Sequence, residues 1–147
     1  MLSIHSPQYA AYPGEYIPKQ KIMKALAEGY FESDKISLNP KHSISQTDEY
    51  YKIEMTIPGI KRENLLVTTN EKGSLCIMGY KTGKKSTKSH NAPAVKNRMD
   101  TFLREIPLPE DADTDFTSAS CHEGTLTIFF TRTGRNPRKR ASTIVVY

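Results

Sequence analysis

The chain has 147 residues, of which 37% are hydrophobic, and it carries 21 basic and 16 acidic residues for a net charge of +5. This length suits one domain with tails, and the modest apolar fraction predicts a small core with flanking segments that need a partner. No apolar run approaches the length of a membrane span, and the first residues lack the layout of a secretory signal. We therefore expect a cytoplasmic protein without a membrane span.

The first 35 residues form a separate N-terminal region, rich in aromatic side chains and interrupted by prolines. Pro18 suits the first turn of a helix, and Ile22, Leu26 and Tyr30 then recur at intervals of four. Gly29 is expected to end this short amphipathic helix. Because so short a helix is marginal alone, its apolar stripe packs either on its own domain or on a partner.

Residues 36–131 alternate apolar and polar side chains in short runs, which predicts half-buried strands. Edge strands are expected at 36–38 and 42–44, on either side of Pro40. Inward-facing apolar residues then mark further strands: Ile53, Met55 and Ile57; Leu65 and Val67; Leu75 and Ile77; Phe102 and Ile106; Thr117, Ala119 and Cys121; Leu126, Ile128 and Phe130. The pattern predicts an all-β, immunoglobulin-like antiparallel sandwich followed by an extended tail at 132–147.

Two basic segments stand out against this pattern. Residues 81–98 and 132–140 hold 11 of the 21 basic residues and no acid, so the rest of the chain has 10 basic against 16 acidic residues. Such blocks are typical of solvated, flexible loops, although they leave nucleic-acid binding as an alternative. Neither segment contains aromatic side chains that could stack on bases, and we expect no nucleic-acid partner.

No pattern in the sequence predicts catalysis. The four histidines are isolated, and Cys76 and Cys121 form no C-x-x-C motif. Metal sites and nucleophilic dyads require closer or differently spaced groups. We expect no cofactor, no metal and no enzymatic activity.

Five segments, taken in order, resemble the small heat-shock proteins and their α-crystallin domain. The match covers roughly residues 36–147. The segments are Ile57-Pro58-Gly59-Ile60, the L-x-I-x-G strand at 75–79, the F-x-R-x-φ-x-L-P run at 102–109, the A-x-x-x-n-G-x-L run at 119–126, and Ile144-Val145-Val146 as a C-terminal I-x-V anchor. Departures are Glu123 and Thr125 at the A-x-x-x-n-G-x-L run and the basic character of loop 81–98.

The resemblance implies an ATP-independent chaperone (holdase) that binds unfolding client proteins and works as a dynamic, dimer-based homo-oligomer. It also implies roles for individual residues. The tail anchor would be Ile144 and Val146, received by a neighbour's groove at Leu65, Val67, Ala119 and Cys121. The dimer interface would include Ala94, Val95 and Arg104, with loop 81–98 as a possible exchanged strand. Client binding would fall to Tyr9, Tyr12, Tyr16, Ile22, Leu26 and Phe31.

One further alternative is a monomeric CS-domain-like co-chaperone, an interaction module with a related sandwich. Such a module would lack a tail anchor, so the presence of Ile144 and Val146 argues against this alternative. Arg104 also keeps two interpretations, either an ion-pair partner that is buried or at a dimer interface, or an outward strand residue.

Overall fold

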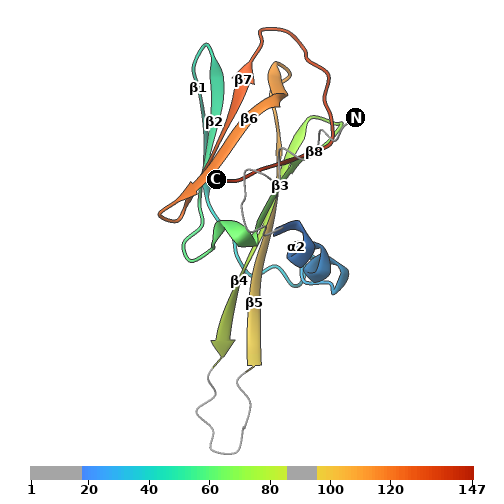
Figure 1. Cartoon of the computed structure of the whole chain (residues 1–147), viewed down its shortest axis with the longest axis vertical. Helices are drawn as coiled ribbons and strands as arrows, with labels where there is room; N and C mark the ends of the chain where they lie inside the picture. Colours follow the sequence, from blue (N-terminus) through green and yellow to red (C-terminus); the bar gives the residue numbers. More distant parts are fainter. Residues whose placement is uncertain (1–17, 86–95) are drawn as a thin grey trace, which may run out of the picture.

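Two four-stranded antiparallel sheets form a sandwich in the computed structural model, which describes residues 18–85 and 96–147. Its elements are α2 (Pro18–Ala27), β1 (His42–Gln46), β2 (Tyr50–Thr56), the 3-10 helix η1 (Arg62–Asn64), β3 (Leu65–Thr69), β4 (Ser74–Lys85), β5 (Lys96–Pro107), β6 (Ala112–His122), β7 (Thr125–Arg132) and β8 (Ser142–Ile144). One sheet has the order β1-β2-β7-β6 and the other β5-β4-β3-β8 (Figure 1). The predicted all-β sandwich is confirmed.

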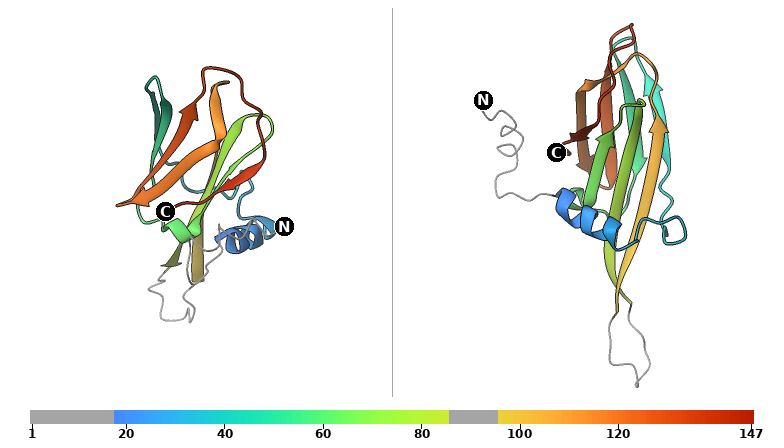
Figure 2. Two further views of the ribbon diagram at one scale, coloured as in Figure 1. Left: turned by 45° about the horizontal axis from the view of Figure 1, so that its top comes forward. Right: turned by 90° about the vertical axis from the view of Figure 1, so that its right-hand side faces the viewer.

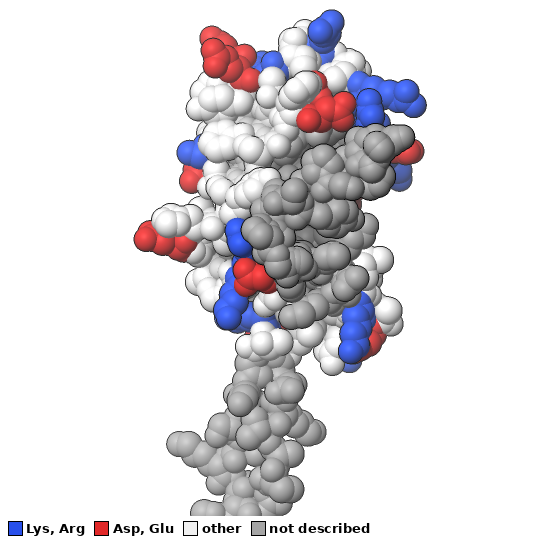
Figure 3. All heavy atoms as spheres, viewed as in Figure 1, with Lys and Arg blue, Asp and Glu red and all other residues white. Residues whose placement is uncertain are grey.

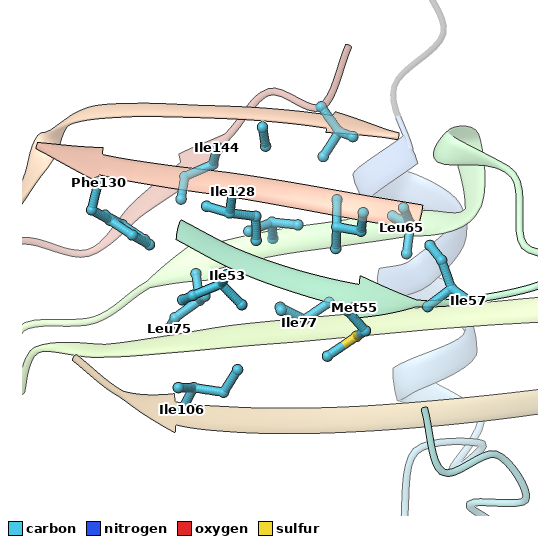
Figure 4. Close-up of a cluster of buried hydrophobic side chains, with 14 of the residues drawn as sticks. Ile53, Met55, Ile57, Leu65, Leu75, Ile77, Ile106, Ile128, Phe130 and Ile144 are labelled. Carbon is cyan, nitrogen blue, oxygen red and sulfur yellow. The ribbon is translucent and has the colours of Figure 1, made fainter. Parts of the chain in front are cut away.

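The core lies between the two sheets and is built from the alternating residues that the sequence marks as inward-facing (Figure 4). Ile53 and Met55 of β2 face Ile77 of β4 across the sandwich, and Ile128 of β7 completes this layer, all at most 1% exposed. Because side chains alternate along a strand, one apolar face per strand is enough to form this core.

The second sheet is apolar on its outer face as well, and α2 covers that face (Figure 2, right). Ile22 and Ala25 of the helix pack with Leu66, Met78 and Tyr80. The helix starts at Pro18 and is followed by Gly29, which has a φ of +85°, as the sequence predicts. The predicted stripe is wrong in its face, since Leu26 and Tyr30 are 44% and 37% exposed while Ala25 and Phe31 are buried.

The hairpin of β4 and β5 is longer than predicted and extends beyond the rest of the sandwich (Figure 1). Its register runs from Ser74–Pro107 to Lys85–Lys96, so both ends of the expected loop 81–98 are strand. Residues 81–85 and 96–98 lack apolar alternation, and their pairing could therefore not be predicted from the sequence.

The edge strand expected at 36–38 is absent. The N–H groups of Ser37 and Leu38 both donate to the carbonyl of Thr101 on β5, at 3.1 and 2.9 Å. Two donors on one carbonyl place the segment across the edge of β5, where a strand would instead run along it.

A polar cluster links β2, β7 and the segment before β6 at one end of the first sheet. The Asp111 carboxylate accepts hydrogen bonds from the Tyr51 hydroxyl at 2.5 Å and from Arg132 Nε at 3.2 Å. The Arg132 guanidinium also lies 4.9 Å from the centre of the Tyr51 ring. The Tyr51 hydrogen bond, helped by Arg132, lowers the pKa of Asp111 below its ordinary value.

We expect this cluster to make folding stability sensitive to acid. With its pKa lowered in the folded state, Asp111 stabilises the fold fully above its unfolded pKa of about 3.9, and this contribution is lost as the pH falls through the folded pKa. Urea unfolding from about pH 6 to about pH 3 should therefore show a smaller acid-dependent loss of stability in Asp111→Asn than in the wild type. Equal losses in the two proteins would contradict this role.

Candidate tail-binding groove

β6 is an edge of the first sheet, and β3 would be an edge of the second sheet without the tail strand β8; the two border a groove that the C-terminal tail fills. β8 pairs antiparallel with β3, where Val67 lies opposite Ile144. Two residues later, Val146 forms a parallel bridge with Ala119 of β6. The exposed fractions of Ile144 and Val146 are only 9% and 5%, because both side chains point into the core cluster. The tail thus closes an edge that would otherwise offer unpaired backbone groups.

Four of the predicted site residues line this groove. Leu65 and Val67 are buried on β3, Ala119 is buried on β6, and Cys121 is partly buried beside the same cluster. The backbone N–H of Cys121 donates to the carbonyl of Tyr147 at 2.8 Å, and the N–H of Tyr147 donates to that of Ala119 at 3.0 Å. The structure brings the predicted anchor and groove together within one chain, and their use between chains stays a prediction.

Polar residues that sequence reasoning missed hold the path of the tail before it reaches the groove. Lys139 Nζ donates to the carbonyls of Glu110 at 2.9 Å and Ala112 at 2.6 Å. Buried Thr69 donates from Oγ1 to the carbonyl of Arg140 at 2.9 Å and lies 2.9 Å from Ser142 Oγ. No periodic pattern marks these contacts, since they join backbone carbonyls to single side chains far apart in sequence.

The chemistry of the groove is that of a binding surface. Burial raises the pKa of the Cys121 thiol, and the Glu63 carboxylate raises it further, so the thiol is protonated at neutral pH. Within residues 18–85 and 96–147, no three His, Cys, Asp or Glu side chains are grouped so as to hold a metal ion. Over the same residues, no helix has the length and apolar character to span a bilayer.

Arg104 lies on the same face of β5 as Phe102 and Ile106, and it is half-buried. Its NH2 group donates to Asn39 Oδ1 at 2.6 Å and to the Pro40 carbonyl at 3.0 Å. A further hydrogen bond joins NH1 to His42 Nδ1 at 3.1 Å. Arg104 therefore holds the segment that leads into β1, and its role in a dimer interface stays a prediction, as do those of Ala94 and Val95, which lie outside the described residues.

The predicted client-binding residues divide into three groups. Tyr9, Tyr12 and Tyr16 lie outside the described residues. Ile22 and Phe31 are buried against the outer face of the second sheet, at 0% and 4% exposed, whereas Leu26 is open to solvent. Sequence reasoning missed the residues of the sheet that form this face, Leu66, Met78 and Tyr80. They are apolar at outward positions, which is the signal of a strand buried on both faces.

Basic and acidic side chains are interspersed on the face seen in Figure 3. Three basic residues of segment 132–140 have intramolecular partners. Arg132 pairs with Asp111, Arg140 lies 3.6 Å from Asp115, and Lys139 is bound to two carbonyls. These contacts stabilise the tail on its own domain and reduce the positive charge that is free for a polyanion.

Comparison with known proteins agrees with this geometry. The chain is 26% identical over 113 residues to a 22.0 kDa heat shock protein of Arabidopsis thaliana, covering 76% of this chain but 58% of that protein. It is 27% identical over 112 residues to the 16.9 kDa class I heat shock protein 3 of rice, covering 76% of this chain and 75% of the relative. Among solved structures, a small heat-shock protein from Xylella fastidiosa matches with a TM-score of 0.54 and 28% identity, over 69% of this chain and 93% of that one.

A family model agrees in turn with these relatives. The model of the Hsp20/alpha crystallin family matches residues 43–146, from β1 to the second anchor residue of the tail. Small heat-shock proteins are not enzymes, in agreement with the expectation from the sequence. The chain therefore belongs to the Hsp20/alpha-crystallin family of small heat-shock proteins.

Proposed function

We infer that this chain is an ATP-independent holdase that binds unfolding proteins and prevents their aggregation, working as a dynamic homo-oligomer. The observation that carries this inference is the C-terminal tail in the groove between β3 and β6. The tail is a short extended element joined to the sandwich by residues 133–141. An element of this kind can leave its own groove and fill that of a second copy with the same contacts, as in domain swapping.

Each such link between chains would be weak. Burying Ile144 and Val146 contributes roughly 1.5–3 kcal/mol per side chain. Ordering the tail and losing rigid-body freedom costs several kcal/mol. Only several links acting together would hold an oligomer, and single links would exchange readily. Heating would then release subunits and expose apolar surface to unfolding clients. We place this activity in the cytoplasm, as predicted from the sequence.

Client binding is assigned to the apolar residues of the N-terminal region, Tyr9, Tyr12, Tyr16, Ile22, Leu26 and Phe31. Leu26 could bind a client while α2 still lies on the sheet, because it is 44% exposed on the outward side of the helix. Ile22 and Phe31 would become available only after α2 leaves the sheet. Exposed apolar side chains of this kind bind the apolar patches that unfolding proteins present.

One observation favours the alternative of a monomeric interaction module. The single chain satisfies its own groove, and a linked tail competes with a free one at an effective concentration that reaches the millimolar range for short flexible linkers. Docking within one chain does not depend on protein concentration, whereas links between chains do. The mass of the native protein over a dilution series therefore separates the two functions.

We expect the purified chain to form oligomers that dissociate on dilution and to suppress the heat aggregation of citrate synthase without ATP. Size-exclusion chromatography with light scattering measures the mass, and the turbidity of heated citrate synthase measures protection. A monomer at every concentration that leaves citrate synthase to precipitate would exclude the holdase. A monomer that binds an ATP-driven chaperone would support the co-chaperone instead.

A further inference from the structure

The outer face of the second sheet is apolar in a way that the sandwich core does not require. Leu66 on β3, Met78 on β4 and Leu103 on β5 form one row across this face, because Leu66 pairs with Met78 and Met78 pairs with Leu103. Tyr80 and partly buried Cys76 flank Met78 along β4 on the same face. A sheet that faced only water would place polar residues at these positions.

The helix α2 covers most of this face through few side chains. Ile22 and Ala25, three residues apart, are its buried contacts, and Phe31 follows after the turn at Gly29. Under this cover the exposed fractions of Leu66, Met78 and Tyr80 are 7%, 8% and 5%. Leu103, at the margin of the row, is 39% exposed. Among the side chains that the structure describes, those of α2 and the following Phe31 therefore bury this sheet face.

This cover can leave without detaching the chain. A helix of ten residues is marginal without tertiary contacts, and its first turn carries no acidic residue to stabilise the helix dipole. A polar anchor follows the helix, where Thr101 Oγ1 donates to the carbonyl of Tyr30 at 2.8 Å. Loss of the contacts of Ile22 and Ala25 would thus uncover the part of the sheet under α2 while residue 30 stays attached.

We propose that the face formed by Leu66, Met78, Tyr80 and Leu103 is a second client-binding surface, which α2 occupies until a segment of an unfolding protein replaces it. This inference rests on the proposed function. The helix that fits the face indicates the chemistry of the segment it receives. α2 buries residues three apart and carries three lysines and no acid, while Glu105 lies on the same face opposite Cys76. The preferred client segment is therefore a short amphipathic helix with aliphatic residues three apart and without acidic residues.

Cys76 provides an internal probe of this event, since it packs against the cluster under α2. In full-length protein with Cys121→Ser, the rate of thiol labelling at Cys76 measures how often the face is uncovered. Ile22→Asp should release the helix and raise this rate about tenfold or more. Met23→Asp introduces the same charge on the same helix at a side chain that is 46% exposed, and it should leave the rate unchanged.

The sign of the change in activity distinguishes the sheet from the helix as the binding surface. If the sheet face binds clients, Ile22→Asp protects heated citrate synthase at temperatures where the wild type and Met23→Asp do not. If only the helix and the segment before it bind clients, the loss of Ile22 leaves protection unchanged or lowers it. Either of the latter results, or a Cys76 rate that does not change, overturns the proposal.

A second measurement does not depend on the stability of any variant in the helix. A photoreactive residue in place of the exposed Leu103 should cross-link to citrate synthase during heating and not before it. No cross-link at Leu103 in a protein that still protects citrate synthase would overturn the proposal and leave the proposed function intact. Failure of every form of the chain to protect citrate synthase would contradict the proposed function itself.

Discussion

Replacement of both Ile144 and Val146 by Ser is expected to release the tail from the groove and to reduce the proposed oligomer to its smallest unit. The two side chains are the apolar contacts of the tail with β3 and β6, and each contributes roughly 1.5–3 kcal/mol when buried. The hydrogen bonds of β8, Thr69, Lys139 and Tyr147 exchange with water, so their net contribution is too small to hold the tail in the groove without these side chains. The sandwich should stay folded, because its main core lies between β2, β7, β3 and β4.

Size-exclusion chromatography with light scattering measures the loss of assembly, and far-ultraviolet circular dichroism checks the fold. Val145→Ser is the matched control, because residue 145 lies between the anchors and points to the other side of the extended tail. Thiol labelling gives an independent readout in protein with Cys76→Ser, since Cys121 lies at the end of the groove. An unchanged elution volume together with unchanged labelling of Cys121 would remove the tail from the proposed assembly.

The sandwich was predictable because most of its strands have an apolar residue at every second position, on the face that points into the core. Ile53, Met55 and Ile57 illustrate this, since all three were predicted as core and all three are at most 1% exposed. The groove residues Leu65, Val67 and Ala119 could be named for a related reason, because the resemblance to the family assigned them to the same two edges. Periodicity and motif thus predicted most of what lies between the sheets.

What lies outside the sandwich was less predictable, because it depends on contacts without a period. The helix α2 was expected to bury Leu26, yet Ala25 is buried instead and packs with Ile22 in the cluster that contains Met78. The contacts of Lys139 and Thr69 with backbone carbonyls follow from the path of the tail alone. The sequence also could not distinguish a tail that docks on its own chain from one that docks on a neighbour, because both use the same residues.

A large effect of a single added methyl group on stability is expected at Gly79, on the strand that carries the L-x-I-x-G motif. Gly79 lies directly opposite Phe102 in the ladder between β4 and β5. A Cβ atom at Gly79 would lie 2.4 Å from Cε1 and 2.9 Å from Cζ of the Phe102 ring, and 3.0 Å from Cδ2 of Leu65. The ring is 1% exposed and is surrounded by the core, so it has little room to move.

Gly79→Ala should therefore destabilise the fold by about 1–3 kcal/mol, the usual cost of inserting a carbon atom into a packed core. The stiffer unfolded chain of the alanine variant offsets about 0.4–1 kcal/mol of this cost. The midpoint of urea unfolding measures the difference, and it is compared at one protein concentration because the proposed assembly would contribute to stability. A midpoint equal to that of the wild type would show that the ring can move aside.

A second substitution tests whether the ring of Phe102 is the cause. Phe102→Leu alone should lower stability, because it leaves a cavity under β4. In the double variant the methyl group introduced by Gly79→Ala enters the space that the ring has left. The double variant should therefore lose less stability than the sum of the losses of the two single variants. Additive losses would place the strain elsewhere. The glycine of this motif is then explained by close packing against an aromatic ring, since Gly79 is not among the glycines of positive φ in this chain.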